Sequence, residues 1–102
     1  MEDKMNNIAS IASSALNFYG IKQAVTANNV ANLETRDFKA SAVLAQEKAN
    51  GGVNAIVVKT NDSVDISREA TNMISNSNGF KANIKTLKTQ DEMTKELLNI
   101  KA

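Results

Sequence analysis

One cluster of side chains could perform acid–base or metal chemistry, namely the carboxylates of Asp91, Glu92 and Glu96 near the end of the 102 residues. Paired carboxylates can act as acid and base or bind a metal ion, but such a site also needs a pocket and convergent partners. The sequence has no histidine and no cysteine, so the commonest metal ligands, nucleophiles and near-neutral bases are absent. Carboxylates and lysines alone do not exclude catalysis, but we predict a protein that is not an enzyme, with no catalytic, metal-binding or cofactor-binding residues.

Three lysines, Lys81, Lys85 and Lys88, recur at helical spacing and would form a basic stripe. The net charge is only +1, and no aromatic residues interleave the stripe, so no nucleic-acid partner is expected. A solvated helix face is the simpler interpretation, and contact with an acidic face of another subunit is the alternative. Gly51-Gly52 is a turn and not a phosphate loop, because no G-x-x-x-x-G-K pattern follows it.

The segment from Met5 to Leu33 has a single charged residue, Lys22, while Asn, Ser, Thr and Ala interrupt its apolar residues throughout. A surface helix normally keeps Lys and Glu on the side that faces water. A helix over this segment is therefore expected to be surrounded by other protein. No run of 18 apolar residues exists, and the first residues lack the basic and apolar regions of a cleaved signal, so we expect neither membrane insertion nor a cleaved signal peptide.

Apolar spacing predicts a first helix over residues 5–33, with apolar residues on more than one face. Lys22 and Asn29 interrupt its main row, which consists of Ile8, Ile11, Ala15, Phe18 and Val25. A helix that is apolar on several faces is normally buried on several faces.

A second helix is predicted over residues 65–100, with Asp65 as its N-cap and a possible kink at residues 76–79. Its apolar residues fall on two interleaved heptad rows. One row contains Ile66, Met73, Phe80 and Leu87, and the interleaved row contains Ala70, Ser77, Ile84 and Leu98. The apolar stripe then drifts to Met93, Leu97 and Ile100, as a helix does against a strict heptad.

The middle of the chain is short. Residues 34–37 are predicted to form a turn or helix exit, and residues 53–59 a strand, but residues 40–50 could be helix or strand. The expected fold is mainly α, with two long terminal helices paired as an antiparallel coiled coil or hairpin and joined by a short β-prone connector. The corresponding segments are an N-terminal helix module (1–39), a connector that is a hairpin or a loop (40–63) and a C-terminal helix module (64–102), the two helices forming one domain.

Both terminal segments carry motifs. The first contains Ala27-Asn28-Asn29-Val30-Ala31-Asn32, followed by Thr35 and Phe38-Lys39, and the second contains Val64-Asp65-Ile66 with Glu69, then Phe80-Lys81-Ala82-Asn83 and Glu92-Met93. These stretches resemble the bacterial flagellar rod and hook family, whose N-terminal pattern is A-(S/N)-N-(I/V)-A-N, then T-x-G-(Y/F)-K. The family's C-terminal pattern is V-D-(L/I)-x-x-E, then an aromatic residue followed by x-A-N and an acidic-Met pair. The resemblance covers about two-thirds of the chain, in the family's order.

The chain departs from that pattern at the helix exit and in the connector. Glu34, Arg36 and Asp37 stand where the family often has Asn, Pro or a small residue, and Gly. Asp can adopt the positive φ that suits Gly there, at some cost. Residues 40–63 are far shorter than the β-rich outer domains of hook and distal rod proteins, so the chain resembles a minimal, short proximal-rod-like member.

The resemblance implies that the terminal helices pair and pack into the core of a helical tube. It also implies export from the cytoplasm by the flagellar type III apparatus, without a cleaved signal, and motility as the process served. We therefore expect a structural subunit of the periplasm-spanning basal-body rod, with itself, other rod subunits and the export apparatus as partners. Two alternatives remain open: a small flagellar adaptor or export-associated regulator with rod-like termini, and, more weakly, an amphipathic peripheral membrane protein, which the first helix does not favour because it lacks a Lys/Arg face.

The residues expected at the helix-pairing or subunit interface share apolar or amide side chains and fall within the two motifs or on the heptad rows. They are Ile8, Ile11, Ala15, Phe18, Val25, Asn28, Asn29, Asn32, Phe38, Met73, Phe80, Asn83, Ile84, Leu87, Met93 and Leu97.

Overall fold

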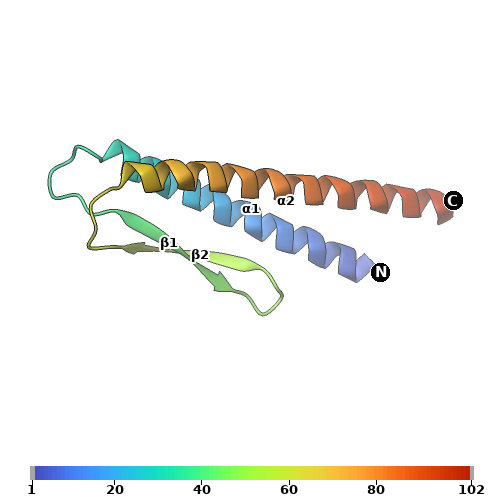
Figure 1. The fold of residues 1–102 in the computed structure, drawn as a ribbon. Helices are drawn as coiled ribbons and strands as arrows, with labels where there is room; N and C mark the ends of the chain where they lie inside the picture. Colours follow the sequence, from blue (N-terminus) through green and yellow to red (C-terminus); the bar gives the residue numbers. More distant parts are fainter. Residues whose placement is uncertain (1, 102) are drawn as a thin grey trace.

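The computed structural model describes residues 2–101, with the side chains of residues 7–100. The elements follow in the order α1 (Glu2–Ala31), β1 (Ser41–Glu47), β2 (Val53–Lys59) and α2 (Ile66–Lys101). Helix α1 lies between α2 on one side and the β1–β2 hairpin on the other, and both chain ends lie at the same end of the molecule (Figure 1). The molecule is elongated, with extents of 64 × 25 × 14 Å. The predicted fold, two long terminal helices with a short β connector, is confirmed.

The connector is a β-hairpin, which settles the alternatives left open for residues 40–50. Strands β1 and β2 pair antiparallel with Leu44 opposite Ile56. A tight turn joins them, in which the Lys48 amide donates to the Gly52 carbonyl at 2.8 Å and Gly51 has a φ of 91°. Since a residue with a side chain rarely adopts this φ, glycine at position 51 determines where the hairpin turns.

Helix α2 begins at the expected cap. The Asp65 Oδ1 accepts hydrogen bonds from the amides of Ser67 at 3.0 Å and Arg68 at 3.2 Å, which satisfies two of the free donors at the helix start. The helix then continues through Gly79 without a break. At the exit of α1, Asp37 has a φ of 60°, so this residue does adopt the conformation for which glycine is better suited.

The interior is small and polar. Among the residues whose side chains are described, the buried apolar residues are Ala12 and Ala40, whereas the buried polar residues are Thr26, Asn29, Glu69 and Asn76. Within residues 2–101, no helix is long and apolar enough to cross a membrane. Larger apolar side chains are half-buried or exposed, so packing inside this chain leaves much of their surface uncovered.

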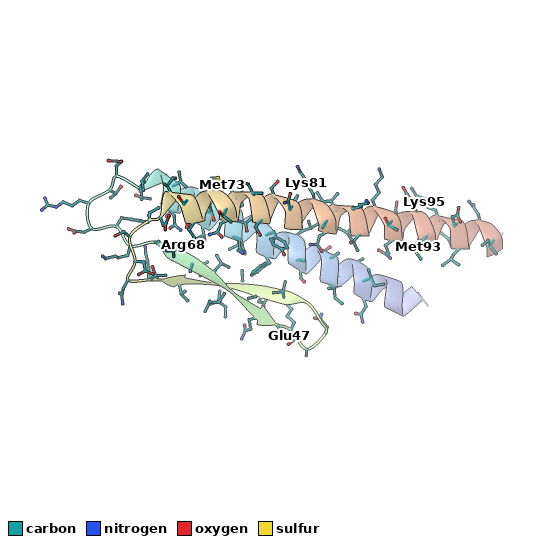
Figure 2. All side chains as sticks on the ribbon, in the orientation of Figure 1. Glu47, Arg68, Met73, Lys81, Met93 and Lys95 are labelled. Atoms are coloured by element: carbon teal, nitrogen blue, oxygen red, sulfur yellow. The ribbon has the colours of Figure 1, made fainter. Side chains whose placement is uncertain are left out.

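Two polar residues of α2 are buried against α1. Ala70 and Ile84 are exposed, and the positions buried against α1 are Glu69 and Asn76, which lie one heptad apart. The apolar pattern did not indicate these two positions, because their side chains are polar. Figure 2 shows Lys95 on the side of α2 that points away from α1.

Candidate interaction site

Asn29, near the end of α1, connects three elements. Its side-chain Nδ2 donates to the Ser41 carbonyl at 2.9 Å, and its Oδ1 accepts from the Ser41 amide at 2.9 Å. The amide therefore bonds the first residue of β1 as a neighbouring strand would. Only 1% of Asn29 is exposed, so these bonds are protected from competing water.

The same amide also reaches α2. Asn29 Nδ2 donates to Glu69 Oε1 at 3.2 Å, and Glu69 is 5% exposed. The second carboxylate oxygen of Glu69, Oε2, is buried and has no hydrogen-bond partner within the described structure. An unsatisfied buried acceptor is costly, so this position is held by the surrounding packing. Asn29 and Glu69 together fix where α1, β1 and α2 meet.

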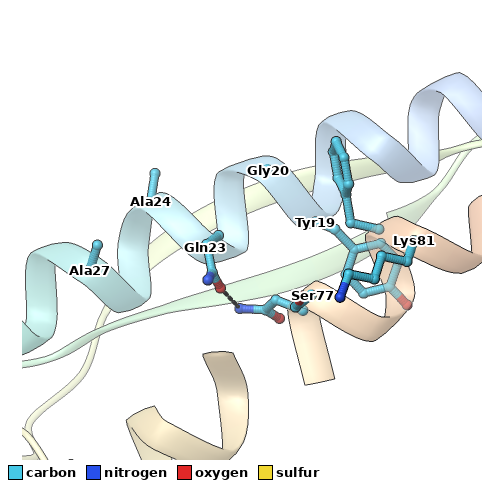
Figure 3. Close-up of a pocket in the computed structure, with 9 residues that line it drawn as sticks. Tyr19, Gly20, Gln23, Ala24, Ala27, Ser77 and Lys81 are labelled. Carbon is cyan, nitrogen blue, oxygen red and sulfur yellow. Dashed lines mark hydrogen bonds between the residues drawn. The ribbon is translucent and has the colours of Figure 1, made fainter. Parts of the chain in front are cut away.

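A second amide contact lies one heptad further along α2. Asn76 Nδ2 donates to Gln23 Oε1 of α1 at 3.0 Å (Figure 3). Three residues later, Gly79 lies against the ring of Tyr19, and a methyl group on Gly79 would overlap the ring. The predicted weak point of α2 is thus a place where a glycine allows an aromatic ring of α1 to pack directly against α2.

The turn end of the hairpin is held by Ser14. Its Oγ donates to the Ile11 carbonyl at 2.8 Å and accepts from the Val53 amide at 3.0 Å, and the turn at Gly51 lies against the Ile11 side chain. Ser14 and Asn29 are about 22 Å apart along the helix axis, at about 1.5 Å per residue. The seven-residue β1 spans about 20 Å, at about 3.4 Å per residue. The strand therefore fits between the two polar anchors on α1.

The three predicted asparagines have different environments. Asn29 is the buried junction, whereas Asn28 is exposed. Asn32 acts locally at the helix end, because its Nδ2 donates to the Asn28 carbonyl at 2.9 Å and its Oδ1 accepts from Thr35 Oγ1 at 3.0 Å. Asn32 thus has the helix-end role that is common for Asn.

The other predicted interface residues fall into two groups, half-buried and exposed. Half-buried positions are Ile11, Ala15, Phe18, Val25, Phe38, Met73, Asn83, Leu87 and Leu97. Exposed positions are Ile8, Phe80, Ile84 and Met93. Two of the half-buried residues have partners outside the helix pair or within their own helix. Asn83 Nδ2 donates to the Gly79 carbonyl of its own helix at 2.8 Å, and the centre of the Phe38 ring lies 4.1 Å from Lys59 Nζ of β2.

Sequence reasoning missed the residues that hold the elements together through polar contacts. They are Ser14, Tyr19, Gln23, Glu69, Asn76 and Gly79. For two of them, the sequence contained one signal: Glu69 and Asn76 lie seven residues apart, as residues on one side of a helix do. Within the described residues, no group of three or more acidic side chains is arranged to hold a metal ion.

Comparison with known proteins gives two matches. The family model described as flagella basal body rod protein matches residues 10–39, and the model described as flagellar basal body rod FlgEFG protein C-terminal matches residues 63–100. Together they account for about two-thirds of the chain, and the Asn29–Glu69 hydrogen bond joins one matched segment to the other. A search of curated proteins found no match.

Proposed function

Because the chain belongs to the family of flagellar basal body rod proteins, we propose that it is a non-enzymatic structural subunit of the rod that polymerises through α1 and α2. Membership of this family implies a place in the flagellar basal body among other rod components. The finer proposal is that the chain contributes, as a short proximal-rod-like member, to the axial tube that acts as the drive shaft. It would reach that place by type III export, without cleavage of a signal.

The observation that carries the proposal is the shortage of buried apolar surface. Side chains such as Ile74, Met93 and Leu98 are 65%, 55% and 60% exposed, whereas the only fully buried apolar residues among the described side chains are two alanines. Exposed apolar surface of this extent is typical of a protein whose core is completed by its neighbours. Packing in a tube would cover these side chains and supply the missing hydrophobic stabilisation.

The exposed side of α1 supports the same proposal. The residues Ser13, Asn17, Gly20, Ala24, Ala27 and Ala31 are exposed and follow one another at helical spacing. They carry no charge, so this side is poorly suited to permanent contact with water and well suited to a close approach of another helix.

The deciding experiment is to isolate basal bodies and look for the chain by mass spectrometry and by immunogold labelling. A rod subunit is expected to co-purify with the other rod proteins in a stoichiometric amount, and a strain lacking the chain should stop assembly at the rod. Recovery only from the cytosol, bound to export chaperones, would instead favour the adaptor or regulator. Co-sedimentation with anionic liposomes would revive the membrane-surface interpretation.

A further inference from the structure

A groove runs along one flank of the helix pair, with a volume of about 510 Å³ (Figure 3). Gly20, Ala24 and Ala27 of α1 line it, and all three are exposed. Tyr19 and Phe80 also line the groove, together with Lys81, whose ammonium group is exposed. The groove is therefore apolar and shallow over α1, with a positive charge at its α2 border.

One polar atom near this groove has no partner in the described structure. Asn76 lines the groove and is 1% exposed, and its Oδ1 has no hydrogen-bond donor. A buried amide oxygen without a donor costs about 1 to 3 kcal/mol. A hydroxyl group brought into the groove by another molecule could satisfy it with a small adjustment of the surrounding side chains.

The other flank of the pair has complementary properties. A hollow near the end of α2 is lined by Thr89, Glu92, Met93 and Glu96. Met93 is 55% exposed, with the carboxylates of Glu92 and Glu96 and the Thr89 hydroxyl on one side. On its other side, Met93 lines a second hollow with Lys85 and with Ile8 of α1, so the carboxylates form only the outer part of this surface. At about 100° per residue, Met93 and Phe80 point about 140° apart around α2. The acidic surface and the groove are thus on opposite flanks of one molecule.

We propose that the Met93 surface of one copy of the chain docks in the groove of the next copy. Met93 would pack on Ala24 and Phe80, Glu92 or Glu96 would pair with Lys81, and the Thr89 hydroxyl would donate toward Asn76. Because the two surfaces are different and lie on opposite flanks, the contact is head-to-tail and repeats from copy to copy. The contact rests on the proposed function in that it supplies one of the subunit contacts that a polymer requires.

The chain contains no cysteine, so the contact can be tested by disulfide cross-linking without other substitutions. The double variant Ala24→Cys, Met93→Cys is expected to give a ladder of oligomers after mild oxidation of the concentrated full-length chain. A mixture of the two single variants should stop at the heterodimer, because each chain then has one reactive surface. A variant with Ala49→Cys in the exposed hairpin turn in place of Met93→Cys is the matched control and should give no ladder.

Charge exchange tests the same contact without cysteine. Lys81→Glu and Glu96→Lys should each weaken association about twofold to fivefold at low salt, as expected for exposed ion pairs, and the two variants mixed should recover it. Cross-linking of the double variant Ala24→Cys, Met93→Cys is then repeated in isolated basal bodies. A cross-link from Ala24 to a different rod protein, or the absence of a ladder, overturns the proposed contact while the chain's presence in basal bodies still supports the proposed function. Absence from basal bodies together with a ladder overturns the function and leaves the contact.

Discussion

The two long helices differ in how they are charged and how they are covered. Helix α1 has 30 residues and, beyond its first turn, one charged residue, Lys22. Helix α2 has 36 residues and ten charged ones, including Lys95, which points away from α1 (Figure 2). The protein itself covers α1 on two sides, by α2 and by the hairpin, but covers α2 on one (Figure 1). Apart from the buried Glu69, the described charged side chains of α2 are exposed to water. The third side of α1 carries no charge, and it is the side that we propose another subunit covers.

The largest effect on assembly is expected for a change at Phe80, an apolar side chain of α2 that lies next to α1. Phe80 is 39% exposed at the edge of the groove, and Phe80→Asp should abolish incorporation into basal bodies, because a carboxylate would be buried without a partner. Lys85→Ser, on the solvated side of α2, should be nearly silent. Swimming on soft agar and the content of purified basal bodies report both variants. Normal assembly of the Phe80 variant would mean that this helix edge is no interface.

The next largest effect is a loss of folding stability, expected for a change at Asn29, which joins α1 to β1 and α2. Asn29→Ala removes the bonds to Ser41 and Glu69 and leaves their buried groups unsatisfied, so the free energy of unfolding should fall by about 3 kcal/mol or more. Asn28→Ala, the exposed neighbour, should change it by less than about 0.5 kcal/mol. Urea titration followed by far-UV circular dichroism measures both. Equal losses in the two variants would refute the special role of position 29.

The sequence predicted the bounds of the two helices better than it predicted the residues that pack between them. Both were predicted within a few residues, because each has a long apolar periodicity and α2 begins at an Asp cap. The burial of Glu69 and Asn76 against α1 was not predicted, because an apolar pattern does not mark polar residues as buried. Polar burial depends on hydrogen bonds to residues 40 or more positions away, such as Asn29 to Glu69, and periodicity carries no information about those pairs. The family motif could single out Asn29, but only the fold shows that Ser41 and Glu69 are its partners.

A third prediction compares the one glycine in each helix. A methyl group on Gly79 of α2 would overlap the Tyr19 ring, whereas one on Gly20 of α1 would meet nothing within 4 Å. Overpacking costs about 1 to 3 kcal/mol, and alanine gains about 1 kcal/mol over glycine in a helix. Gly79→Ala should therefore lower the free energy of unfolding by up to about 2 kcal/mol, while Gly20→Ala should raise it by about 1 kcal/mol. The same urea titrations measure them, and a shift of the same sign in both would contradict the close approach of α1 and α2.

The smallest loss of stability is expected when the N-cap of α2 is removed. The same variant tests whether α2 needs α1 to remain helical. Asp65 caps α2 through the amides of Ser67 and Arg68 and lies 3.8 Å from the Arg68 guanidinium. Asp65→Ala should cost about 1 kcal/mol, mostly through the lost cap, because the exposed ion pair adds little. Asp62→Ala, an exposed acidic residue of the preceding turn, is the matched control and should cost less than about 0.5 kcal/mol. Hydrogen exchange of the Ser67 and Arg68 amides separates a local from a global loss. Faster exchange confined to the first turn would mean that contact with α1 holds the rest of α2 in place. Faster exchange along the whole helix would mean that α2 forms from its own cap and that α1 packs on it afterwards.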